Sequence, residues 1–200
     1  EFKGFVWLEV SVAALGSLAI LGMSGLVAVF FLLPQMLADL YGVSYDLFSA
    51  GRLFGTLQSW AENAPYFMGA LIGFLIGMEI PLIARVRESI YKRHLVNNTG
   101  TIYGADYIGA GVGAALWVFV MLKMDVSLAA SATASLNLFT GFVFLIIYRK
   151  RIKGWFWPVL VHLLMVPVIL GIFAKGPAMM NWMNDTLYLD HVIYRAQTTY

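Results

Sequence analysis

The chain contains no cysteine, and only 12% of its 200 residues are charged. Without cysteine, neither a disulfide framework nor a thiolate metal site can form. Soluble domains carry about 25% charged residues, whereas this chain is 60% apolar with a mean hydropathy of +0.79. Intrinsic disorder and a basic nucleic-acid-binding domain are therefore excluded, since the net charge is only +2.

Long apolar runs are what the sequence has in excess. A helix needs about 20 apolar residues to cross a bilayer core of about 30 Å. Five runs reach that length, at about 5–33, 66–84, 102–122, 128–148 and 155–174. They predict an all-α fold, a polytopic transmembrane helix bundle, and Pro34 is expected to end the first span. We expect residues 1–176 to form this domain and 177–200 to be a linker, in a chain that is part of a longer protein.

The segment between the first two spans is amphipathic. Apolar residues recur at helical spacing, at Leu47, Leu53, Phe54, Leu57 and Trp60. This pattern predicts a helix over about 45–60 that lies in the membrane interface. An ordinary loop helix outside the membrane is the alternative.

Two basic loops predict the orientation. They contain Arg85, Arg87, Lys92 and Arg93 after the second span, and Arg149, Lys150, Arg151 and Lys153 after the fourth. Two spans separate these loops, so both lie on one side, which the positive-inside rule makes cytoplasmic. We therefore expect an integral protein of a bacterial cytoplasmic (inner) membrane. Five spans would place the C-terminus on the opposite side.

Glycines at four-residue spacing predict helix-packing faces, because membrane helices associate through close backbone approach. They are Gly69, Gly73 and Gly77 in the second span, with Gly109 and Gly113 in the third. The expected partners are the lipid bilayer and other membrane helices, from further spans, a second copy or a larger complex. The run 109–114 also fits a dinucleotide-binding pattern, but no strand precedes it, so no cofactor is expected in this chain.

Two intramembrane carboxylates mark a candidate polar site, since ionisable groups are costly in hydrocarbon. Glu79 ends the second span beside Pro81, where a kink is expected, and Asp106 opens the third beside Tyr107. Three interpretations stay open: a structural helix–loop junction, a proton or cation site, or a contact to a substrate amine. No catalytic residue and no metal site are expected, and His162 is interpreted as a hydrogen-bonded packing residue. Glu9 is expected at the level of the lipid headgroups.

Two motifs carry a family resemblance. The runs from Leu75 to Leu82 (LIGMEIPL) and from Asn98 to Gly111 (NTGTIYGADYIGAG) resemble the membrane region of membrane-bound polyamine aminopropyltransferases, the spermidine synthase-like proteins. The tail from Asp190 to Tyr200 resembles the lead-in to that family's catalytic domain. The resemblance implies transfer of an aminopropyl group from decarboxylated S-adenosylmethionine to putrescine, by a domain beyond Tyr200. It also implies about two further spans before Phe5.

The sequence therefore favours the non-catalytic membrane domain of a spermidine synthase-like protein. Two alternatives remain, a structural or assembly subunit of a larger membrane complex and a small-cation or polyamine transporter. A polyamine-making domain should meet its substrates in the cytoplasm, which conflicts with the predicted position of the C-terminus.

Overall fold

The computed structural model describes residues 1–49, 51–91 and 95–188, and every long element in these ranges is helical. The helices are α1 (Phe2–Tyr41), α2 (Tyr45–Ser49), α3 (Arg52–Gly77), α4 (Glu79–Tyr91), α5 (Leu95–Phe119), α6 (Val126–Tyr148) and α7 (Phe156–Tyr188), with 3-10 turns η1 (Met121–Lys123) and η2 (Arg149–Arg151). Five helical segments are long and apolar enough to cross a membrane, with α3 and α4 forming one of them. The all-α fold with five candidate spans is confirmed.

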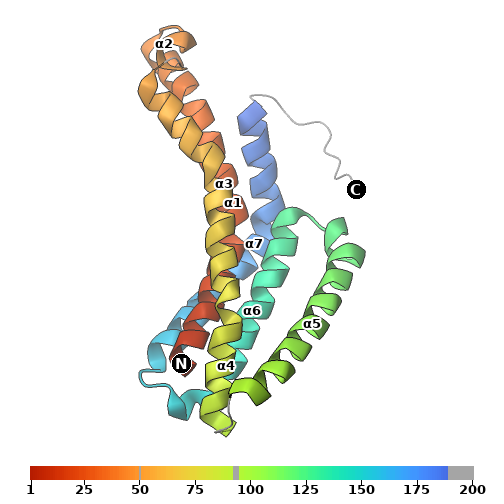
Figure 1. Cartoon of the computed structure of the whole chain (residues 1–200). Coiled ribbons are helices and arrows are strands. Elements are labelled where there is room, and N and C mark those ends of the chain that lie inside the picture. The colour runs from red at the N-terminus through yellow and green to blue at the C-terminus, as the bar shows by residue number, and fades with distance from the viewer. Residues whose placement is uncertain (50, 92–94, 189–200) are drawn as a thin grey trace.

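Helix α1 is the central element of the bundle (Figure 1). It packs against α6, α7 and α3, and α6 also packs against α7. The buried side chains along this contact include several small residues: Ala13, Ser17, Ser131 and Ala134. Since lipid is as apolar as leucine, close packing of small residues holds membrane helices together. The tight core of this chain is therefore the α1–α6–α7 contact.

The helices extend further than the apolar runs suggest. The expectation that Pro34 ends the first span is wrong, because α1 continues through Pro34 to Tyr41. A proline removes only one backbone donor, and membrane helices tolerate this. The helix ends at Gly42, whose φ of 64° is left-handed, with the Val43 N–H donating to the Ala38 carbonyl at 3.0 Å. This is the glycine-terminated end that helices commonly adopt.

Two further boundaries differ from the expectation. A single interfacial helix over 45–60 is not observed, because α2 covers 45–49 and α3 already begins at Arg52, after the extended Gly51. The linker expected at 177–200 is helical up to Tyr188, since α7 continues through Pro177. Polar residues such as Glu62 and Asp185 lie outside the apolar runs but inside the helices. The rest of the expected linker, 189–200, lies outside the described residues.

Both basic segments lie at one end of the bundle, the lower end in Figure 1, where the N-terminus also lies. One apolar cluster joins Phe2 and Val6 of α1, Val86 of α4, Leu145 of α6 and Ile152 after η2. The Arg151 guanidinium lies over the Phe2 ring, 5.4 Å from its centroid. Lys92 and Arg93 lie outside the described residues. The far end of α7 lies at the opposite end, where a Cβ added to Gly25 would meet Met183.

Helix α5 stands apart from this core on one side of the bundle (Figure 1). Its main contacts are with α4 and η1, and within its apolar window no residue is buried. Trp117 reaches a shallow groove that is otherwise lined by α1, α3 and α6. Most of the surface of α5 is thus open to lipid or to other helices.

Candidate functional site

The break between α3 and α4 positions the first predicted site residue. Met78 interrupts the helix with φ −80° and ψ −12°, and its N–H donates to the Phe74 and Leu75 carbonyls. Pro81 lies just after the break, which agrees with the expected kink. Glu79 becomes the first residue of α4, where the positive end of the helix dipole favours a carboxylate. Its side chain is half-buried.

The two predicted carboxylates belong to a group of three. Asp106 on α5 is exposed, yet it lies within electrostatic range of Glu79. Glu79 in turn lies within electrostatic range of Glu9 on α1. The three carboxylates come from α1, α4 and α5, and α4 packs against both α1 and α5.

Tyr107, the third predicted residue, has 75% of its surface exposed. It shares α5 with Asp106. The role of Glu79, Asp106 and Tyr107 as a polar site remains a prediction.

The structure brings together two buried ionisable side chains, Glu9 and His162, that the sequence does not connect. Glu9 is 4% exposed and His162 is 1% exposed, so both side chains lie inside the helix bundle. Gly141 of α6 lies between them: a Cβ added to Gly141 would be 2.6 Å from His162 Nε2 and 2.8 Å from Glu9 Cβ. Three helices therefore meet at one point, and the missing side chain of Gly141 makes the contact possible. The interpretation of Glu9 as a headgroup-level residue stays a prediction, and its burial shows that the side chain faces other helices.

These three residues share one depth in the bundle. Glu9 follows the start of α1 by seven residues, His162 follows the start of α7 by six, and Gly141 precedes the end of α6 by seven. At 1.5 Å per residue, this places all three about 10 Å from the basic end. We call them the Glu9–Gly141–His162 junction.

The hydrogen bond of His162 fixes which ring nitrogen carries the proton. His162 Nδ1 lies 2.8 Å from the Pro158 carbonyl oxygen, which can only accept, so Nδ1 donates. Pro158 lies in the first turn of α7, so its carbonyl is one helical turn before His162. In the neutral ring, Nε2 is then an acceptor. It is buried and has no hydrogen-bond partner among the described residues. The expectation that His162 is hydrogen-bonded is correct for one nitrogen only.

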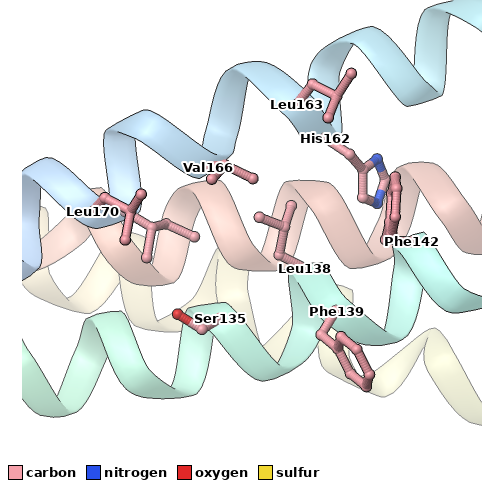
Figure 2. A pocket seen from close by; sticks show the side chains of 9 residues that line it. Ser135, Leu138, Phe139, Phe142, His162, Leu163, Val166 and Leu170 are labelled. Carbon is pink, nitrogen blue, oxygen red and sulfur yellow. The ribbon is translucent and has the colours of Figure 1, made fainter.

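A pocket of about 310 Å³ lies beside His162, between α6 and α7 (Figure 2). Its walls are apolar apart from His162 and Ser135, and they comprise Leu138, Phe139, Phe142, Leu163, Val166, Ile169 and Leu170. The Phe142 and His162 rings lie side by side, with centroids 6.4 Å apart. The Ser135 hydroxyl donates to the Ser131 carbonyl at 2.7 Å. The pocket could hold an apolar chain whose polar end is near the histidine.

The predicted packing glycines face open space in this chain. A Cβ added to Gly69, Gly73, Gly77, Gly109 or Gly113 would meet no atom within 4 Å. Their role in packing remains a prediction, and any partner must come from outside the described ranges. Gly141 and Gly176 are different, because an added Cβ would come within 3 Å of a neighbour. Spacing identified the regular stripes, whereas the close contacts occur at isolated glycines.

Comparison with known proteins gives the family. Over 199 residues, 100% of its length, the chain is 47% identical to the polyamine aminopropyltransferase of Shewanella oneidensis. The chain is homologous to the polyamine aminopropyltransferases. It is also 30% identical over 66% of its length to the polyamine aminopropyltransferase of Corynebacterium efficiens. A third such relative, polyamine aminopropyltransferase 2 of Streptomyces coelicolor, is 32% identical over 64% of the chain.

The homology covers only part of each aminopropyltransferase. The chain spans 35% of the Shewanella protein, 27% of the Corynebacterium protein and 24% of the Streptomyces protein. Together with the five apolar helices, this identifies the matched region as the apparent membrane portion of these proteins. No family model matches the chain, and no solved structure matches it.

Proposed function

We propose that this chain is the membrane domain of an enzyme that transfers an aminopropyl group from decarboxylated S-adenosylmethionine to putrescine. The full-length identity of 47% to a polyamine aminopropyltransferase carries the proposal. The chain spans 35% of that relative, which leaves room for a separate catalytic domain. In this proposal the chain anchors that domain to a bacterial cytoplasmic membrane and does not itself perform the transfer.

The open surface of α5 supports a second part of the proposal, which concerns partners. A membrane helix normally packs against its neighbours on at least one face, but the apolar window of α5 is entirely unburied. We propose that further membrane helices cover α5, from the rest of the enzyme or from an assembled complex. The glycines at 109 and 113 would lie in that contact.

The complete reading frame tests the proposal. The protein that it encodes, purified into lipid nanodiscs, is incubated with decarboxylated S-adenosylmethionine and putrescine. Mass spectrometry should detect spermidine and an equal amount of methylthioadenosine, because the aminopropyl group leaves the sulfur and forms a bond to the putrescine nitrogen. The 200-residue chain, tested in parallel, should give neither product. A stop codon soon after Tyr200, or a full-length protein without product, would contradict the proposal.

A further inference from the structure

We propose that the groove between α4 and α6 binds an anionic phospholipid, with an acyl chain in the groove and the phosphodiester at the basic end of the bundle. The groove has a volume of about 400 Å³, and Phe5 of α1 contributes to its wall. Both helices pack against α1, but within the described ranges they do not pack closely against each other. The groove opens at the surface, where its lining residue Ile147 is 64% exposed. A ligand can therefore enter it sideways from the bilayer.

The lining of the groove changes from apolar to polar along its length. Away from the basic end its wall is apolar apart from Thr140, whose hydroxyl donates to the Leu136 carbonyl at 2.9 Å and is thereby satisfied. The polar lining residues Arg87, Tyr91 and Tyr148 lie in the last two turns of α4 and α6. This order matches a phospholipid, whose chain is apolar and whose head group is polar.

The charge around the polar end of the groove selects the head group. The basic end comprises residues 1–3, 85–91 and 149–153, the lower end in Figure 1, and these ranges contain seven basic and two acidic side chains. The Arg151 guanidinium lies 5.4 Å from the centroid of the Phe2 ring, which lies 5.2 Å from that of Tyr148. Arginine binds phosphate through two parallel N–H donors. Arg87 on α4 and Arg151 after α6 can therefore hold one phosphodiester, and basic pockets of this kind favour anionic lipids.

The length of the groove favours a lipid over a further membrane helix. From Phe139 to Tyr148 it follows α6 for about 14 Å, at 1.5 Å per residue. One leaflet is about half of a bilayer core of about 30 Å. A crossing helix would need a contact face along the whole core, whereas a phospholipid occupies one leaflet. The groove therefore has the extent of a single lipid in the leaflet that faces the basic end.

Titration of the chain in detergent with phosphatidylglycerol, followed by native mass spectrometry, tests the inference. We expect one lipid to bind saturably. Its affinity should exceed that of phosphatidylethanolamine with the same chains by at least about fivefold, the factor that one basic side chain contributes near an anionic lipid surface. Glycerophosphoglycerol, which has the same head group without acyl chains, should not compete, because it leaves the apolar groove empty.

Two pairs of variants locate the site. Arg87→Gln should weaken phosphatidylglycerol binding by at least about tenfold, because a hydrogen bond between charged groups is lost. Arg85→Gln removes the same charge from an exposed position on α4 that does not line the groove, so the loss should be about fivefold or less. Ile147→Trp should fill the groove and abolish binding. Ile146→Trp is its matched control, because Ile146 is the preceding exposed residue of α6 and lies outside the lining.

Each outcome supports or overturns the inference. Equal affinity for the two lipids would overturn it, and so would competition by glycerophosphoglycerol, which would indicate a site for a soluble phosphate ester. Equal losses in Arg87→Gln and Arg85→Gln, or unchanged binding by Ile147→Trp, would show that general basic charge and not the groove attracts the lipid. The comparison of the two lipids uses the unmodified chain, so it decides the matter even if a variant misfolds. None of these measurements depends on aminopropyl transfer, so their failure would leave the proposed function unaffected.

Discussion

Gly141→Ala is the substitution whose effect the structure determines most directly. The added Cβ would lie 2.6 Å from His162 Nε2 and 2.8 Å from Glu9 Cβ, closer than van der Waals contact allows. Neither neighbour can yield easily, because His162 is held by the bond from Nδ1 to the Pro158 carbonyl and Glu9 Cβ is attached to the backbone of α1. Overpacking of this kind costs about 1–3 kcal/mol. The substitution should therefore destabilise the α1–α6–α7 contact.

Thermal unfolding in detergent, followed by circular dichroism, measures the effect. For a chain of this size, 1 kcal/mol corresponds to roughly 2–4 °C in Tm, so Gly141→Ala should lower Tm by about 2–12 °C. Gly22→Ala is the control, because a Cβ at Gly22 of α1 would meet nothing within 4 Å. There the greater helix propensity of alanine should leave Tm unchanged or slightly higher. A Tm of Gly141→Ala at or above that of the unmodified chain would refute the close approach of the three helices.

Three further predictions address the cap of α6, the glycine stripe and the orientation. Asp125→Ala should cost about 0.5–2 kcal/mol by thermal unfolding, because the Asp125 carboxylate accepts from Ser127 N–H at 2.9 Å and from Ser127 Oγ at 2.6 Å. An unchanged Tm would contradict this role. Gly73→Ala should leave the Tm of the isolated chain unchanged and weaken only its association with other helices, measured by crosslinking. Since the chain has no cysteine, Lys150→Cys and Ser44→Cys give single labels, and an impermeant maleimide should reach only Ser44→Cys in intact spheroplasts. Labelling of Lys150→Cys there would reverse the orientation.

Hydropathy was sufficient to predict the spans, because a bilayer imposes a length and a composition on every crossing helix. It was insufficient for the helix ends. Pro34 and Glu62 lie inside helices that continue past them, since the end of an apolar run marks where the lipid ends and not where the backbone hydrogen bonds end. Gly42 shows a signal that does end a helix. Its backbone is left-handed, and a residue with a side chain would be strained in that conformation.

The sequence predicts candidate site residues where a local motif marks them. Glu79 lies at the helix break beside Pro81, whereas Asp106 lies inside α5, and the two are in electrostatic range. The Glu9–Gly141–His162 junction has no such motif, because its members come from three helices that are distant in the sequence. A lone glycine, a lone histidine and one carboxylate near a helix start carry no spacing signal. Only the packing of α1 against α6 and α7 brings them together.

The same packing bears on the side of the membrane that each end faces. The cluster of Phe2, Val86, Leu145 and Ile152 fixes both basic segments and the start of α1 at one end, while α7 runs to the other. A cytoplasmic catalytic domain attached directly after α7 is incompatible with a cytoplasmic position of the basic loops. The labelling of Lys150→Cys and Ser44→Cys separates the two possibilities. If Lys150→Cys is protected, a domain that uses cytoplasmic putrescine requires one more crossing between α7 and that domain.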